Sequence, residues 1–172
     1  MARVTGFGPV ADQRARVLIL GSMPGVASLQ ACQYYALPRN AFWPIMGRLF
    51  GAGADLPYEQ RLQALKDQRI ALWDVLAQCD RPGSLDSAID MKTARPNDFK
   101  SLFRRYRSIR HVVFNGAKAA DLYRRRVLPQ VQLEAPYLTY TRLPSTSPAM
   151  ASLDFEQKLE AWSVLTEHLQ TR

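Results

Sequence analysis

Two short, continuous apolar segments constrain the fold of this chain more than any other feature of its sequence. Residues 16–21 read RVLILG and residues 109–116 read IRHVVFNG, and each segment ends in glycine. Apolar runs of this length are typical of strands that are buried on both faces of a parallel sheet. Two further strand candidates are residues 70–76, IALWDVL, and residues 137–143, YLTYTRL. We therefore predict a sheet of four strands.

Helical patterns lie between and after the predicted strands. The clearest covers residues 40–50, where Asn40 can cap a helix whose apolar side chains recur at helical spacing until Gly51 ends it. Similar patterns predict helices over residues 57–68, 97–107, 117–128 and 154–169. Strands that alternate with helices predict an α/β fold, here a three-layer αβα sandwich around a central, mainly parallel four-stranded sheet. Residues 79–96 are the least regular stretch and are expected to form a long surface loop.

Length and composition narrow the class of protein. A chain of 172 residues suits one domain, which we place over residues 1–172. It lacks an apolar run that could span a membrane, and its first 17 residues lack the features of a secretory signal, so we expect a cytoplasmic protein. Cys32 and Cys79 are too few for an iron-sulfur cluster and too far apart for a zinc motif. We therefore expect no metal and no cofactor.

The net charge and the predicted topology indicate where a ligand binds. The net charge of +8 favours a polyanionic partner. In an open parallel sheet, ligands bind beyond the carboxyl ends of the strands. The loops that follow the four predicted strands are therefore expected to form the site, namely residues 21–40, 74–88, 115–118 and 144–151. The basic stretches 100–110 and 124–126 are candidates for phosphate contacts, although arginines on a helix more often mark a solvated face.

Three of these loops contain unusual combinations of residues. GSMPG, residues 21–25, is typical of a tight turn whose backbone can approach a ligand closely, but it is neither a P-loop nor a GxGxxG motif. QYYALPRNAFW, residues 33–43, places two tyrosines before a helix on which Phe42 and Trp43 have the spacing of core residues. LPSTSPAMA, residues 143–151, suits either an ordinary turn or a stiff loop whose hydroxyls bind phosphate oxygens.

Taken together, these segments resemble the uracil-DNA glycosylase superfamily, and most closely its hypoxanthine-DNA glycosylase branch, called family 6. The resemblance rests on GSMPG, YYALPRNAFW, LWDVLAQCDRPGSLDSAI, VVFNG and LPSTSPA, which occur in the order of the family between residues 16 and 151. It implies a monofunctional enzyme that flips a deaminated base out of DNA and hydrolyses its N-glycosidic bond. Hypoxanthine is the implied base, and uracil or a G:U or G:T mismatch is the alternative.

The resemblance also implies a base pocket and a group that handles water. Many members carry Asn or Asp at the position of Met23 to hold the attacking water, and methionine cannot do this. In the hypoxanthine branch this role corresponds to Asn40. Met23 and Pro24 would contact the base, Tyr35 would stack on it, and Asn115 would hydrogen-bond its edge.

Contacts to the nucleic acid are implied for a second group of residues. Arg39 and the loop residues Ser145, Thr146 and Ser147 would bind DNA, which is double-stranded or single-stranded, and the enzyme would act as a monomer. This loop lacks the histidine of several other branches, which argues against polarisation of the leaving base by an imidazole. Because the chain shows no recognisable lysine nucleophile motif, we expect simple hydrolysis to an abasic site.

Two other classes of protein compete with the enzyme. Met23 in the usual catalytic position favours a non-catalytic protein that binds DNA lesions. A small hydrolase or nucleotide-binding protein would need a Ser/His pair or a phosphate loop, and neither GxSxG nor a P-loop is present. His111 lies in a predicted strand and His168 in the last predicted helix, where structural roles are more common than catalytic ones.

Overall fold

A computed structural model of the protein describes residues 3–170, so the ends of the predicted domain, residues 1–2 and 171–172, lie outside the described residues. Its centre is a four-stranded sheet in the order β3-β2-β6-β7. Each neighbouring pair of strands is parallel. The sheet contains β2 (Val17–Gly21), β3 (Ile70–Asp74), β6 (His111–Asn115) and β7 (Thr139–Leu143). The predicted parallel sheet is therefore confirmed.

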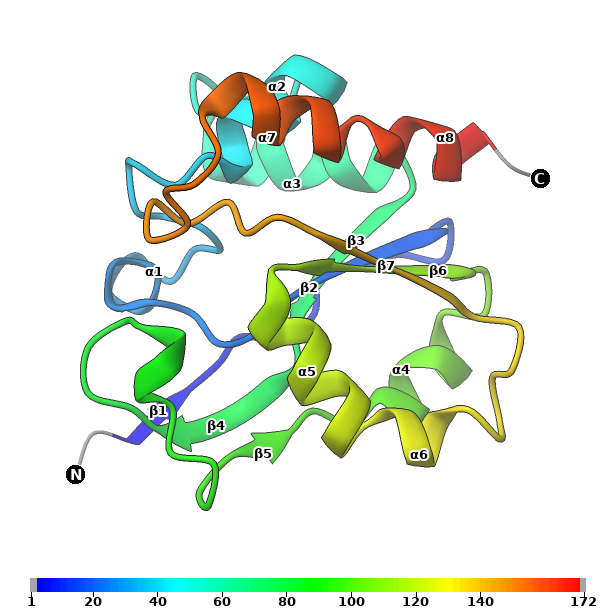
Figure 1. Cartoon of the computed structure of the whole chain (residues 1–172). Coiled ribbons are helices and arrows are strands. Elements are labelled where there is room, and N and C mark those ends of the chain that lie inside the picture. Colours follow the sequence, from blue (N-terminus) through cyan, green and yellow to red (C-terminus); the bar gives the residue numbers. More distant parts are fainter. Residues whose placement is uncertain (1–2, 171–172) are drawn as a thin grey trace.

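Helices cover both faces of this sheet, as Figure 1 shows. One layer contains α2 (Phe42–Phe50), α3 (Tyr58–Asp67), α7 (Phe155–Trp162) and α8 (Val164–Gln170). The other layer contains α4 (Phe99–Arg105), α5 (Ala117–Arg126) and α6 (Leu128–Val131). Alternate side chains of β2 serve the two layers, because Val17 and Ile19 pack with the first and Leu18 and Leu20 with the second. The three-layer sandwich is confirmed.

Several predicted helices end differently in the structure. The predicted helix over residues 154–169 is divided into α7 and α8 at Ser163, whose hydroxyl donates to the carbonyl of Glu160 at 2.6 Å and competes with the regular helix pattern. The predicted helix over residues 117–128 ends at Arg126, and Pro129 lies in the first turn of α6. The cap of α4 is Asp98, which accepts from the backbone N–H of Ser101 at 3.1 Å.

A second, antiparallel sheet corrects two predictions. It contains β1 (Arg3–Thr5), β4 (Leu76–Asp80) and β5 (Arg95–Pro96) in the order β1-β4-β5. The predicted strand over residues 70–76 is wrong at its end, because β3 ends at Asp74 and β4 begins a new sheet at Leu76. The predicted loop over residues 79–96 begins inside β4 and ends at β5, with a 3₁₀ turn, η1 (Asp86–Ala88), between them. Pairing with the distant β1 decides this arrangement.

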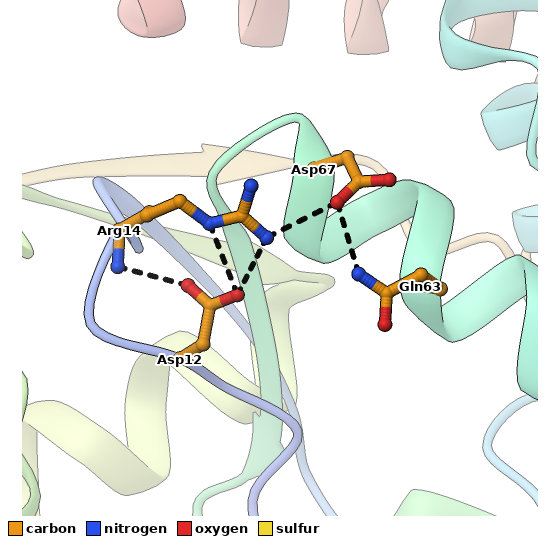
Figure 2. Close-up of polar contacts among 4 residues, drawn as sticks. All are labelled: Asp12, Arg14, Gln63 and Asp67. Carbon is orange, nitrogen blue, oxygen red and sulfur yellow. Dashed lines mark hydrogen bonds and ion pairs between the residues drawn. The ribbon is translucent and has the colours of Figure 1, made fainter.

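The segment before β2 is attached to α3 by polar contacts on the surface, drawn in Figure 2. Arg14 donates to Asp12 at 2.8 Å and to Asp67 at 3.1 Å, and Gln63 donates to Asp67 at 2.9 Å. Exposed ion pairs of this kind stabilise a fold little, so they mainly orient the segment. Across residues 3–170, none of the helices has the length and apolar character needed to cross a membrane.

Candidate active site

A cavity of about 500 Å³ opens at the carboxyl end of the central sheet. Residues from all four loops predicted to form the site line it. Its volume lies in the range of about 300 to 1,000 Å³ that small-molecule sites occupy. Figure 1 shows α1 (Val26–Ala31) beside the loop between β4 and β5 at this end of the sheet, and the backbone N–H of Val26 donates to Ser84 across that contact. The polar part of the lining includes Ser22, Tyr35, Asn40, Asp74, Asp86, Asn115, Lys118, Ser145, Thr146 and Ser147.

The cavity gathers nearly every residue that the sequence suggested for the site. The lining contains the two implied base contacts, the implied stacking ring, both asparagines and the three hydroxyl residues of the last loop. These are Met23, Pro24, Tyr35, Asn40, Asn115, Ser145, Thr146 and Ser147. Arg39 is exposed and is not part of the lining. The residues of four separate loops therefore meet in one place, as the parallel topology predicts.

Asn40 is fixed at the edge of the cavity by two backbone contacts. Its Oδ1 accepts a hydrogen bond from the N–H of Phe42 at 2.9 Å, and the N–H of Ala41 donates to the carbonyl of Thr146 at 2.9 Å. The helix predicted to start at Asn40 starts at Phe42, because Asn40 forms the turn before it. The bond to Phe42 uses one lone pair of the carboxamide and leaves the amino group available to a ligand.

Tyr35 is held in place by its backbone and by one neighbouring ring. Its φ of 55° lies in the left-handed region, which costs a non-glycine residue about 1 to 2 kcal/mol. The Tyr35 ring stacks on Phe42 with centroids 3.9 Å apart and an interplanar angle of 21°. Phe42 and Trp43 are buried, as their helical spacing predicts. Because Phe42 covers one face of the Tyr35 ring, a base can stack only on the other face.

Asn115 at the end of β6 clamps the last loop of the site. Its Nδ2 donates to the hydroxyl of Thr146 at 2.9 Å, and the N–H of Thr146 donates back to Oδ1 of Asn115 at 2.9 Å. From α7, Lys158 donates to the carbonyl of Ser147 at 3.1 Å. The Asn115 amide therefore forms two of its possible hydrogen bonds within the protein. These two bonds hold the loop that contains Thr146 in place.

Asp74 is the principal residue of the cavity that the sequence reasoning did not select. It ends β3 directly beside Gly21 of β2, and only 4% of the residue is exposed. Burial raises the pKa of its carboxyl to about 7, and the negative charge of Asp86 acts in the same direction. A charged residue inside the apolar run of residues 70–76 was the available signal.

Arg81 and Asp86 form hydrogen bonds with the GSMPG turn, and the sequence analysis did not identify either residue. Arg81 is almost fully buried and donates from Nη2 to the carbonyl of Pro24 at 2.6 Å and from Nε to the carbonyl of Gly83 at 2.8 Å. The hydroxyl of Ser22 donates to the carboxylate of Asp86. The loop between β4 and β5 therefore shapes the floor of the cavity, although it looked like an irregular surface loop.

The basic stretch at residues 100–110 lies at a different place. Lys100, Arg104, Arg107 and Arg110 line a second cavity of about 420 Å³ whose lining shares no residue with the first. Arg110 directly precedes β6, so this cavity lies near the amino end of that strand. These side chains do not contribute to the candidate active site.

Comparison with known proteins establishes the family. Residues 7–166 match the family model of the uracil DNA glycosylase superfamily. The chain belongs to the uracil DNA glycosylase superfamily. The resemblance found in the sequence motifs is thus confirmed. Within this superfamily member, the four loops at the carboxyl end of the sheet are the segments that carried the resemblance.

Similar proteins come from two Methanosarcina species. A hypoxanthine DNA glycosylase of Methanosarcina acetivorans is 39% identical over 133 residues, which cover 72% of this chain and 83% of the relative. A hypoxanthine DNA glycosylase of Methanosarcina barkeri is 39% identical over 117 residues, covering 67% of this chain and 73% of the relative. A solution NMR structure of a candidate uracil DNA glycosylase from Methanosarcina acetivorans matches with a TM-score of 0.79 and 34% identity, over 98% of this chain and 99% of that one.

Proposed function

We propose that this superfamily member is a monofunctional DNA glycosylase that hydrolyses the N-glycosidic bond of hypoxanthine in DNA. One observation supports this activity above the others, which is that a carboxamide, Asn40, and an aromatic ring, Tyr35, line the same cavity. The 39% identity to two relatives named hypoxanthine DNA glycosylase supports hypoxanthine as the base. Uracil is the second candidate, because the similar solved structure is named after that activity.

The chemistry suits a site built mainly from neutral groups. Cleavage of the glycosidic bond places positive charge on the sugar and negative charge on the departing base, so fixed dipoles can supply much of the catalysis. Asn40 would hold the attacking water through the second lone pair of its oxygen and would donate from its amino group to the sugar or base. The bond from Phe42 holds the carboxamide in one orientation for this work.

Base flipping is supported by the place of the Tyr35 ring in the lining of the cavity. Extruding a base costs a few kcal/mol, and stacking on an aromatic ring recovers about 1 to 3 kcal/mol. Arg39 is exposed and directly precedes Asn40 in the chain, and Ser145 and Ser147 line the cavity, so these residues would bind the phosphates of double-stranded or single-stranded DNA. We propose that the enzyme acts as a monomer and contacts the base through Met23 and Pro24 as well.

The products are expected to be the base and an abasic site. A lysine that attacks the sugar would give a Schiff base and a strand nick. Lys118 lines the cavity, but its Nζ donates a hydrogen bond to the sulfur of Met91 at 3.7 Å. Simple hydrolysis by the water on Asn40 therefore fits the site better than amine attack.

The test is a single-turnover assay on duplexes that contain hypoxanthine, xanthine or uracil, with abasic product as the readout. We expect excision of hypoxanthine by the wild type and at least about a 100-fold lower rate for Asn40→Ala, as for the loss of other preorganised polar groups. Tyr35→Ala is expected to lose less, and the exposed amide variant Gln132→Ala to keep the wild-type rate. A wild-type rate for Asn40→Ala would remove Asn40 from the mechanism.

A lesion-binding protein without activity predicts another result. In a gel-shift assay it would bind the same duplexes and yield no abasic product over a long incubation. That outcome would refute the proposed enzyme for all three bases.

A further inference from the structure

One polar group in the cavity has no partner and no role in the mechanism above. Asp74 lines the cavity, and its Oδ2 is buried and accepts no hydrogen bond within residues 3–170. Buried polar atoms in native proteins almost always have a partner, and a carboxyl oxygen left without one is costly. A ligand that enters the cavity and bonds to this carboxyl would remove that cost.

The carboxyl lies next to the ring on which the base would stack. A Cβ atom placed on Gly21 would lie 2.5 Å from Oδ1 of Asp74 and 3.1 Å from the hydroxyl of Tyr35, so both groups crowd the same glycine. The Tyr35 hydroxyl is also buried, and it interacts with the side chain of Asn115. The carboxyl of Asp74 is therefore an unpartnered polar group that lies beside the stacking ring. The backbone of Asp74 is itself fixed, because its carbonyl accepts from Nδ2 of Asn97 at 2.8 Å.

The surroundings of Asp74 favour its neutral form. Burial has the largest effect and raises the pKa of the carboxyl to about 7, Asp86 adds to this rise, and Arg81 opposes it. The phenols of Tyr34 and Tyr35 also face this charge, and burial raises the pKa of both, so both stay neutral. A neutral carboxyl offers one O–H donor and one carbonyl acceptor side by side, whereas a carboxylate offers acceptors only.

We propose that the neutral carboxyl of Asp74 binds the lactam edge of the flipped base, accepting from its ring N–H and donating to its neighbouring carbonyl oxygen. This inference rests on the proposed glycosylase activity and identifies the side chain that recognises the base in the enzyme's substrate. Deamination creates such an edge, because it replaces an amino group and a bare ring nitrogen with a carbonyl and a ring N–H. Hypoxanthine, xanthine and uracil all carry it. Asn115 is less suited to this contact, since its amide already bonds twice to Thr146.

The carboxyl and its amide replacement differ in how they respond to pH. Asp74→Asn keeps one donor and one acceptor at every pH, whereas the wild-type carboxyl loses its donor when it ionises. The wild-type kcat/KM for hypoxanthine is expected to fall about tenfold for each pH unit above the pKa of this group. Asp74→Leu keeps a side chain of similar size and offers neither donor nor acceptor.

The experiment measures kcat/KM on hypoxanthine duplexes from pH 5.5 to 8.5 for the wild type, Asp74→Asn and Asp74→Leu. Asp55→Asn, an exposed carboxylate outside the cavity, is the matched control and should follow the wild type. We expect Asp74→Asn to stay within about threefold of the wild type at pH 6 and to exceed it by about 10- to 100-fold at pH 8.5, because the fall that lowers the wild type about 30-fold there is absent. Asp74→Leu should be about 100-fold less active than the wild type at pH 6, and its kcat/KM should not show the fall above pH 7.

Failure of this inference is distinct from failure of the proposed function. If the wild type excises no deaminated base, the proposed function is wrong. If the wild type is active and Asp74→Asn shows the same fall with pH, or is as inactive as Asp74→Leu, then Asp74 does not read the base as a neutral carboxyl. A wild-type rate for Asp74→Leu would overturn the inference as well.

Discussion

The buried carboxyl of Asp74 predicts a large and pH-dependent effect on stability. Its pKa is raised from 3.8 to about 7 in the folded protein, a shift of about 3 units. At about 1.4 kcal/mol per unit, the folded state loses up to about 4 kcal/mol when this group ionises. The native protein keeps the proton between pH 4 and 7 while the unfolded chain has released it. The contribution of Asp74 to stability is therefore greatest below pH 4 and is lost as the pH rises through 7.

Asp74→Asn removes this titration and keeps the shape of the side chain. The variant and the wild type should have similar unfolding free energies near pH 4. Above pH 7 the variant should be more stable by up to about 4 kcal/mol. The measurement is urea denaturation followed by far-UV circular dichroism at several values from pH 4 to 8.5.

The quantity to compare is the difference in unfolding free energy between Asp74→Asn and the wild type at each pH, because another buried group titrates in the same pH range. Burial lowers the pKa of His111 to about 4, and the stacked His168 contributes to the same shift. A histidine that stays neutral in the folded state makes stability rise with pH between 4 and 6.5, which opposes the effect of Asp74. Both chains contain His111, so subtraction removes its contribution. A difference that stays within about 1 kcal/mol from pH 4 to 8.5 would refute a raised pKa at Asp74.

Two further predictions concern the supports of the site. Thr146→Val removes the hydroxyl that accepts a hydrogen bond from Asn115. We expect base excision to be at least about tenfold slower in single-turnover assays. An unchanged rate would contradict the role of this pair in holding the loop. Asp154→Ala removes a capping box in which Asp154 accepts from the N–H of Gln157 at 2.8 Å and the Gln157 side chain accepts from the N–H of Asp154 at 2.9 Å. It should cost about 1 kcal/mol in urea denaturation with normal excision, and a variant as stable as the wild type would refute this estimate.

The sequence by itself determined the central sheet and the place of the site. The segments at residues 16–21 and 109–116 contain the uninterrupted apolar runs VLIL and VVF, which are typical of strands that are covered on both faces. Once the sheet is parallel, the loops after its strands must meet at one edge, so the topology and the family resemblance together predict that Asn40, Tyr35 and Asn115 lie in one cavity. These inferences depend on local patterns and on a general rule of topology.

Only the tertiary structure decided the second sheet and the partners inside the cavity. The strands β1 and β4 are short and pair across more than seventy residues of chain, for example Arg3 with Asp80, and no local pattern encodes such pairing. The sequence alone suggests that the amide of Asn115 is available to bind a base. In the folded protein its Nδ2 donates to the hydroxyl of Thr146 at 2.9 Å. Asp74 stood in the sequence as one acid in an apolar strand. Its unusual chemistry arises because distant segments exclude water from it and bring Asp86 near, and desolvation is a property of the folded chain.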